Sequence, residues 1–132
     1  MSNIIYDIHG AILRIVLAPS DMLEMQVGEG EFLLRDQIGD YHTSYVVDNV
    51  VTDRPIQTTV LNKTTLNADG IDSIEFTNVP NAKIFISGKT RETSIVGEIS
   101  GSDTFSTTIA GTYKVMIQAF PYLDFKTTIE AV

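Results

Sequence analysis

The sequence contains no cysteine and no tryptophan, and it is poor in basic residues. Without cysteine the chain has no disulfide bond, no thiolate nucleophile and no cysteine metal ligand. Lysine and arginine number 9 against 17 aspartate and glutamate, which is a formal charge of −8 over 132 residues. So few basic groups cannot neutralise a run of phosphates or hold the chain on an anionic membrane. Nucleic acid and membrane surfaces are therefore excluded as partners.

The sequence also lacks long hydrophobic runs. Its most apolar stretch, residues 3–17, is interrupted by Asp7, His9 and Arg14, and no basic residue precedes it. This stretch is therefore predicted to be folded structure and not a secretory signal or a membrane span. We expect a protein that is made and folded in a cytoplasm. The hydrophobic content of 43% and the charged content of 20% are typical of a globular chain and not of a disordered one.

The composition changes near residue 54, and this change predicts two domains. Residues 1–54 hold nine acidic and three basic residues, a net charge of −6, whereas residues 55–132 hold eight and six, a net charge of −2. The basic residues of the first part are all arginine, and every lysine lies in the second part. With Pro55 at the change, we predict an N-terminal docking module over 1–54 and a second domain over 55–132.

The N-terminal part is predicted to be a small α+β or β-hairpin module. Apolar stretches at 4–8 and 11–17 flank a turn that contains Gly10, which predicts a β-hairpin. One short helix is predicted near 20–27, with Ser20 as its N-cap. Further strands are predicted over residues 31–35, 41–47 and 50–52.

The second domain is predicted to consist of antiparallel strands with one buried and one exposed face. Apolar side chains recur at every second position, in residues 74–76, 84–86, 113–119 and 125–129. Turn signals recur at short intervals, at residues 69–70, 78–81, 87–88, 97, 100–102, 110–111 and 120–121. This spacing is typical of a β-sandwich. The predicted fold class is therefore mainly β, with the N-terminal module followed by an immunoglobulin-like antiparallel β-sandwich.

One tyrosine supports the prediction of an immunoglobulin-like sandwich. Gly111 lies two residues before Tyr113, which opens a predicted strand. In immunoglobulin-like sandwiches a tyrosine at this place turns its hydroxyl back onto upstream backbone and closes the corner between two strands. We predict that Tyr113 makes this tyrosine corner, and the alternative is an ordinary strand tyrosine.

Two parts of the chain resemble proteins of tailed bacteriophages. The C-terminal part resembles the small immunoglobulin-like modules of virion proteins, in ADGIDSIEFTNVPNAKIFI (68–86), GTY (111–113) and AFPYLD (119–124). The N-terminal part resembles the segment that begins many tail and tail-fibre proteins, in IYD (5–7), GAILR (10–14), Pro19, GEGE (28–31) and RP (54–55). The resemblance covers most of the chain and implies a structural, protein-binding role in a virion, with synthesis in the host cytoplasm.

Residues that could carry catalysis are few. His9 and His42 are the only histidines, and no Gly-x-Ser-x-Gly motif accompanies them. Two carboxylate pairs, Glu29 with Glu31 and Asp36 with Asp40, have spacings that could place both acids beside a substrate, as glycoside hydrolysis requires. In a chain this acidic we expect such carboxylates to be solvated, and we predict that the protein is not an enzyme.

The weak metal candidate is a calcium loop. Asn67, Asp69 and Asp72 place oxygen ligands in a segment that contains Gly70, as in the opening of a calcium-binding loop. The acidic residue expected further along is absent, because residue 78 is Asn. The alternative is a turn in which the side chains bind their own backbone. We predict no cofactor.

Two apolar clusters are candidates for contact with other proteins. Met22, Leu23 and Met25 lie in the predicted helix, where they either pack on the N-terminal sheet or form a partner-binding surface that uses flexible methionines. The second cluster lies at a predicted end of the sandwich and consists of Tyr122, Leu123 and Phe125.

These observations lead to one functional hypothesis and two alternatives. The hypothesis is a non-enzymatic structural component of a phage virion, in the tail, collar, fibre or head decoration, that contacts other virion proteins and forms a homo-oligomer in a symmetric assembly. One alternative is a carbohydrate- or receptor-binding adhesion module, against which the aromatic content of 8% and the absence of tryptophan count. The other is an assembly chaperone that is missing from the finished particle.

Overall fold

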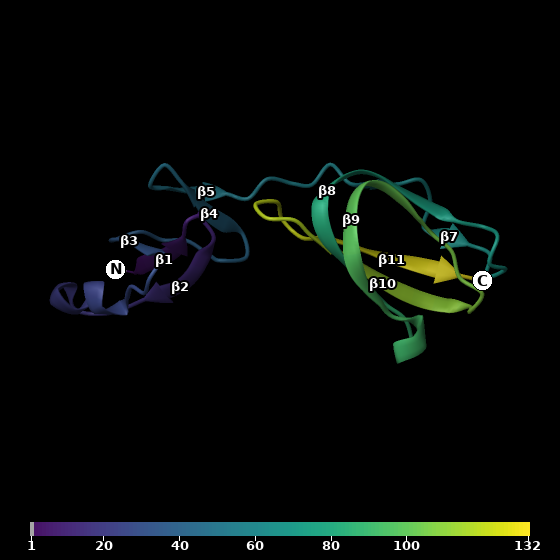
Figure 1. Cartoon of the computed structure of the whole chain (residues 1–132), viewed down its shortest axis with the longest axis horizontal. Helices are drawn as coiled ribbons and strands as arrows, with labels where there is room; N and C mark the ends of the chain where they lie inside the picture. Colours follow the sequence, from purple (N-terminus) through teal and green to yellow (C-terminus); the bar gives the residue numbers. More distant parts are fainter. Residues whose placement is uncertain (1) are drawn as a thin grey trace. The chain divides into compact units, whose positions relative to one another are not determined.

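The computed structural model describes residues 2–132, and strands make up most of its regular structure (Figure 1). The chain divides into two compact units, Met1–Pro55 and Ile56–Val132, which we call unit 1 and unit 2. Each unit has a hydrophobic core of its own. The protein is mainly β, and its sheets are chiefly antiparallel. Within residues 2–132, none of the helices has the length and apolar character needed to cross a membrane.

Unit 1 is built on a three-stranded antiparallel sheet of order β2-β1-β3, formed by β1 (Asn3–Asp7), β2 (Ile12–Val16) and β3 (Glu31–Leu34). The predicted hairpin is present, because β1 pairs with β2. Gly10 has a φ of +88° in this hairpin, and a Cβ there would lie 2.1 Å from the carbonyl oxygen of Val46. Only glycine fits this turn, because both its backbone conformation and this close approach exclude a side chain.

A second hairpin of unit 1 joins β4 (Ser44–Val47) to β5 (Val50–Asp53). Its turn residues Asp48 and Asn49 both have positive φ, 50° and 64°, which is the combination of a type I′ turn. The small core of unit 1 consists of Ile4, Ile12 and Val46, with Tyr6, Leu34 and Val51 packed against it.

The segment between β2 and β3 differs from the prediction. The sequence predicts one short helix near 20–27, but the structure has two consecutive 3-10 turns, η1 (Ser20–Met22) and η2 (Glu24–Gln26). The predicted N-cap is also wrong, because Pro19 precedes η1 and no side chain caps it. The Arg14 guanidinium donates a hydrogen bond of 2.6 Å to the carbonyl oxygen of Gln26, which ties η2 to the sheet.

Unit 2 contains one six-stranded sheet in which β6-β8-β10-β11-β7 are neighbours and β9 pairs with β8. The short strands β6 (Val60–Leu61) and β7 (Thr65–Leu66) precede the long strands β8 (Ile74–Ser87) and β9 (Ile95–Phe105). The 3-10 turn η3 (Arg91–Thr93) lies between β8 and β9, and the chain ends with β10 (Gly111–Gln118) and β11 (Phe125–Ala131). The pair β7 and β11 is parallel, and the other pairs are antiparallel.

The predicted turns at 78–81, 97 and 100–102 are wrong, because all three lie inside strands. β8 and β9 form one long hairpin whose register shifts near Val79, which pairs with Gly101. Asn78 and Gly101 have positive φ, 55° and 76°. These residues therefore produce β-bulges, which bend paired strands without reversing the chain. Figure 1 shows β8 and β9 curving together as a result.

The predicted alternation of buried and exposed residues is confirmed in unit 2. Tyr113, Val115 and Ile117 of β10 are at most 2% exposed, whereas Lys114 and Gln118 are exposed. The core also receives side chains from four further strands: Leu66, Ile74, Phe76, Val79, Ile84, Ile86, Ile99, Phe105, Ile129 and Ala131. Both halves of the bent strand β8 thus contribute to one continuous core.

Two buried polar side chains close this core. The hydroxyl of Tyr113 donates a hydrogen bond of 2.7 Å to the carbonyl oxygen of Ile109, which is the upstream backbone bond that the sequence predicts. Gly111, with a φ of +150°, lies between these residues. Gln57 is 8% exposed, and its Nε2 donates to the carbonyl oxygens of Ile117 (2.8 Å) and Leu123 (2.9 Å). The first residues of unit 2 are therefore bound to its last hairpin.

Candidate functional site

The two histidines are exposed residues beside turns. The backbone N–H of His9 donates to the Asp7 carboxylate, and the ring of His42 lies against Tyr41, with centroids 4.2 Å apart. Among residues 2–132, no hydrogen bond joins either imidazole to a serine or threonine hydroxyl. The arrangement that a histidine-activated nucleophile requires is thus not formed by these side chains.

The carboxylate pair of Glu29 and Glu31 is not arranged for acid catalysis. Glu31 accepts a hydrogen bond of 2.7 Å from the backbone N–H of Gly28 and is bound by both terminal nitrogens of Arg14. The Arg14 guanidinium, and after it the Gly28 N–H, lower the pKa of Glu31 from its ordinary value, and the Arg14 pKa is raised in turn. The general acid of a glycosidase needs a raised pKa, which is the opposite of what is found at Glu31. The contacts of Glu31 with Arg14 and Gly28 instead form a structural ion pair at the edge of the sheet. Asp40 accepts the N–H of His42 at 2.7 Å in a turn.

The candidate calcium loop uses its carboxylates on its own chain. Asp69 accepts the backbone N–H groups of Ile71 and Asp72, each at 2.8 Å, and these bonds lower the Asp69 pKa. Asp72 pairs with the Lys63 ammonium at 2.5 Å and accepts the N–H of Asn67 at 2.8 Å, and the lysine is the main cause of its lowered pKa. This is the turn that the sequence offers as the alternative reading. The described chain, residues 2–132, contains no group of three His, Cys, Asp or Glu residues placed to hold a metal ion.

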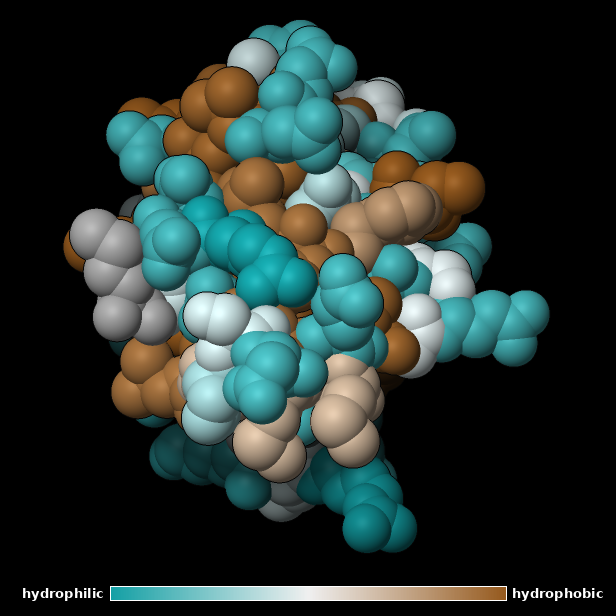
Figure 2. All heavy atoms as spheres, turned by 90° about the vertical axis from the view of Figure 1, so that its left-hand side faces the viewer, coloured by the Kyte–Doolittle hydropathy of each residue, from teal (hydrophilic) through white to brown (hydrophobic). Residues whose placement is uncertain are grey.

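Unit 1 exposes an unusual share of its apolar side chains. Among residues 2–55 the structure leaves eleven large apolar side chains at least 39% exposed: Ile8, Leu13, Ile15, Leu17, Met22, Met25, Phe32, Ile38, Tyr41, Val47 and Val50. Figure 2 shows hydrophobic residues (brown) in several groups at the surface of this side of the molecule, among hydrophilic ones (teal). Exposed apolar side chains that lie next to one another are the kind of surface that a protein partner covers.

The predicted cluster Met22, Leu23 and Met25 is divided by the 3-10 turns. Leu23 is 4% exposed and anchors the segment in unit 1, whereas Met22 is 45% and Met25 is 76% exposed. Both readings of the cluster therefore hold for part of it, because one residue packs inward and two remain at the surface. The second cluster is half-buried: Phe125 packs against the core of unit 2, and Tyr122 and Leu123 lie in the preceding loop.

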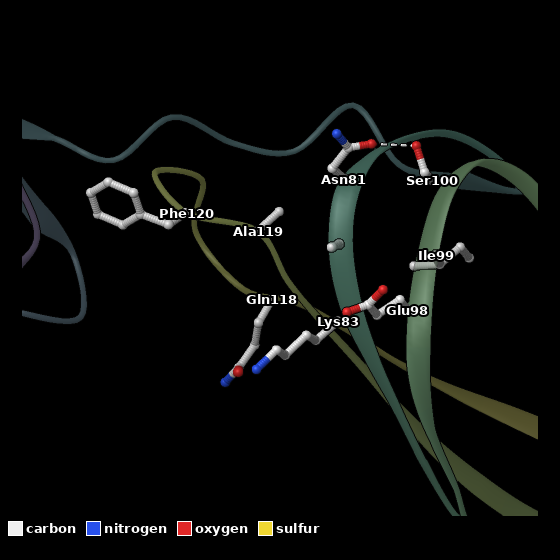
Figure 3. A pocket seen from close by; sticks show the side chains of 9 residues that line it. Asn81, Lys83, Glu98, Ile99, Ser100, Gln118, Ala119 and Phe120 are labelled. Atoms are coloured by element: carbon white, nitrogen blue, oxygen red, sulfur yellow. Dashed lines mark hydrogen bonds between the residues drawn. The ribbon is translucent and has the colours of Figure 1, made fainter. Parts of the chain in front are cut away.

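A polar groove lies on unit 2 where β8, β9 and the end of β10 meet. It has a volume of about 570 Å³ and is lined by Asn81, Ala82, Lys83, Glu98, Ile99, Ser100, Gln118, Ala119 and Phe120. Figure 3 shows Asn81 bound to the hydroxyl of Ser100, and Lys83 beside its cross-strand partner Glu98. The ring of Phe120 points away from the other labelled side chains. The groove therefore offers hydrogen-bonding groups and one aromatic ring, that of Phe120, which does not face them.

A second groove, which the sequence analysis missed, lies on the outer face of the same sheet. It has a volume of about 320 Å³ and is lined by Phe85, Ser87, Lys114, Val115, Met116, Lys126, Thr127 and Thr128. The alternation along β10 and β11 already placed Lys114, Met116 and Lys126 on the exposed side. Only the strand register brings them together, because Met116 lies opposite both Lys126 and Phe85. We call this site the lysine groove.

No known protein family matches the sequence, and comparison with curated proteins and with solved structures finds no significant similarity. The resemblance to phage virion proteins therefore stays a prediction.

Proposed function

We propose that this chain is a non-enzymatic structural component of a tailed-phage virion and acts through contacts with other virion proteins. It is synthesised in the host cytoplasm and ends in the particle. The observation that carries the proposal is the surface of unit 1, where eleven large apolar side chains are exposed and five apolar side chains are buried among residues 2–55. A unit of this kind gains stability when a partner covers it, because burial of apolar area is the main driving force of association.

The charge of unit 1 supports the same reading. Residues 1–54 have a net charge of −6, and Asp21, Glu24 and Glu29 are exposed close to the exposed methionines. An acidic surface with apolar groups favours a partner with a basic surface, which speeds the encounter and selects the orientation. In the proposal unit 1 is the docking module of the chain.

In the finer reading, unit 2 is an immunoglobulin-like sandwich that projects from the docked unit or packs around a symmetric assembly. The Tyr113 hydroxyl bond to upstream backbone supports this reading, since it has the geometry of a tyrosine corner. The single core between both halves of β8, β9, β10 and β11 also supports it. In such a sandwich, the bulged strands β8 and β9 would have to bend so that each contributes to both layers.

Mass spectrometry of washed particles tests the proposal, with the copy number per particle as the second readout. We expect the chain in stoichiometric amounts after washing, at a multiple that matches the symmetry of one part of the virion. A chain that occurs in infected-cell lysate but not in washed particles would contradict the proposal. That result would instead support an assembly chaperone.

A carbohydrate- or receptor-binding module is the second candidate, and the polar groove of Figure 3 is the observation that favours it. Its amide, hydroxyl, carboxylate and ammonium groups are the kinds of groups that bind sugar hydroxyls. Sugar sites also use an aromatic face, and the ring of Phe120, the aromatic residue that lines the groove, points away from the other labelled side chains. Binding on a glycan array that is lost in Asn81→Ala would support this candidate over a purely structural role.

A further inference from the structure

The lysine groove combines an apolar floor with a basic rim. Phe85 of β8 lies opposite Met116 of β10, and Met116 lies opposite Lys126 of β11, so these side chains share the outer face of the sheet. Phe85 and Met116 are half-buried, whereas Lys114 and Lys126 are exposed. The floor is thus partly open to solvent, and two ammonium groups stand beside it.

The basic character of this face is not neutralised within the chain. Lys83, Lys114 and Lys126 all project from it, and the carboxylates on the same face of the sheet are Glu98, opposite Lys83, and Glu130, which accepts the Thr112 hydroxyl at 3.0 Å. Neither glutamate lines the lysine groove. Among residues 2–132, no ion pair is formed by Lys114 or Lys126. The groove therefore has a charge for which the chain supplies no internal partner.

Unit 1 presents a surface with the opposite properties. The segment Ser20–Gln26 exposes Met25 at 76%, and the exposed carboxylates of Asp21 and Glu24 lie on either side of Leu23. The buried Leu23 and the bond from Arg14 to the Gln26 carbonyl hold this segment on the sheet. The competing ion pair is weak, since Glu24 is 3.6 Å from Arg35 and its side chain is 85% exposed.

We propose that the segment Ser20–Gln26 of one copy docks in the lysine groove of a second copy. Met25 enters between Phe85 and Met116, where its thioether contacts the aromatic ring. The carboxylates of Asp21 and Glu24 meet the ammonium groups of Lys114 and Lys126. The occupant is a second copy because the acidic segment and the basic groove are complementary in charge and in apolar character, and one chain has both.

The two surfaces of this contact differ, so the contact is heterologous and joins copies head to tail. Such contacts produce a closed ring when the rotation between copies closes and a filament when it does not. The inference rests on the proposed function, that the chain acts through protein contacts, and it names one of those partners as the chain itself.

Sedimentation velocity of the full chain over a range of concentrations tests this contact. We expect reversible self-association that weakens with salt, because exposed charges are screened at high ionic strength. The variants Lys114→Glu with Lys126→Glu, and separately Asp21→Lys with Glu24→Lys, should each weaken association by at least about tenfold. The fourfold variant that combines all of these exchanges restores complementary charges and should restore association.

A matched control is the pair Lys89→Glu with Arg91→Glu, which makes the same change in net charge outside the lysine groove and should leave association unchanged. Circular dichroism spectra of all variants establish that they are folded. A chain that stays monomeric at low salt and high concentration overturns the inference. Compaction that does not depend on concentration would also overturn it, because it would indicate a contact within one chain. A fourfold variant that fails to associate would overturn it as well.

The failure of this inference is distinguishable from failure of the proposed function. A chain that is monomeric alone but present in washed particles overturns the head-to-tail contact and leaves the virion role intact. A chain that self-associates but is absent from washed particles does the reverse.

Discussion

Among residues 2–55, five apolar side chains are buried and eleven large ones are exposed, whereas among residues 56–132 fourteen are buried and eight are exposed. Unit 2 therefore buries more of its apolar side chains than it exposes, whereas unit 1 exposes more of them than it buries. Unit 1 also has most of the net negative charge. We therefore predict that unit 2 is the more stable unit in isolation, and that unit 1 gains stability when a partner covers its exposed apolar side chains.

The largest expected difference between the units is in the stability that each loses when a phenylalanine is replaced by alanine. Phe76 is 1% exposed in the core of unit 2, and Phe76→Ala should lower the free energy of unfolding of that unit by about 3–5 kcal/mol. Phe32 of unit 1 is 46% exposed and stacks on Tyr6, so Phe32→Ala should cost only about 1 kcal/mol. Urea denaturation followed by circular dichroism measures both. Equal costs would remove the contrast between the units.

A second expectation concerns the point where unit 2 begins. Gln57→Ala removes the donor to the carbonyl oxygens of Ile117 and Leu123, and it should destabilise unit 2 by about 1–3 kcal/mol. Gln118→Ala, an exposed control on β10, should stay within about 0.5 kcal/mol of the wild type. If both variants have the same stability, the hydrogen bonds of Gln57 do not stabilise unit 2.

Tyr113→Phe is a smaller and more specific change. It removes the hydroxyl that donates to the Ile109 carbonyl and keeps the ring, so it should cost about 1 kcal/mol. Tyr122→Phe is the matched control, because the Tyr122 hydroxyl makes no hydrogen bond among residues 2–132. Thermal unfolding of the two variants beside the wild type provides the comparison. A melting temperature for Tyr113→Phe that equals the wild-type value would argue against a corner that stabilises the sandwich.

The smallest expected effect is on the pH dependence of stability. The Lys63 ammonium, and after it the Asn67 N–H, lower the pKa of Asp72 below its unfolded value of about 3.9. A carboxyl group with a lowered pKa in the folded state contributes stability above the unfolded value, and this contribution is lost as pH falls through the folded value. Asp72→Asn should therefore be less stable than wild type at pH 7, and the difference should narrow below about pH 4.

Denaturation at several pH values checks this expectation, with Asp124→Asn as the control, since Asp124 is exposed and forms no ion pair within residues 2–132. A constant difference between Asp72→Asn and wild type at all pH values would show that the Asp72 charge is not the stabilising group.

The sequence was sufficient for the faces of the strands and insufficient for their paths. Alternation along β10 and β11 predicts which residues are buried, because neighbouring residues of a strand point to opposite faces. The stretch 78–81 is predicted as a turn and is a bulge, because asparagine and glycine with positive φ serve both structures. The two cannot be distinguished without knowing which strands pair.

The exposed surfaces could not be predicted in full either, because they too depend on local turns and on strand pairing. The sequence left open whether Met22, Leu23 and Met25 pack on the sheet or face a partner. The burial of Leu23 and the exposure of the two methionines depend on 3-10 turns that the helix signals do not reveal. The lysine groove needs the register of three strands, because Lys114 and Lys126 are distant in the chain and approach only through the pairing of β10 with β11. The turn at Asp69 and Asp72 did not have this limit. Their spacing in the sequence was enough to suggest that their side chains bind their own backbone.

Hydroxyl-radical footprinting of washed particles and of the free chain shows whether unit 1 is the docking surface of this chain. Met25 and Ile38 of unit 1 are 76% and 83% exposed, and Ile71 of unit 2 is 87% exposed. Oxidation of Met25 and Ile38 is expected to be several-fold lower in the particle than in the free chain at a concentration low enough to keep it monomeric, while oxidation of Ile71 is unchanged. Equal oxidation of Met25 and Ile38 in the particle and in the free chain would contradict this role of unit 1.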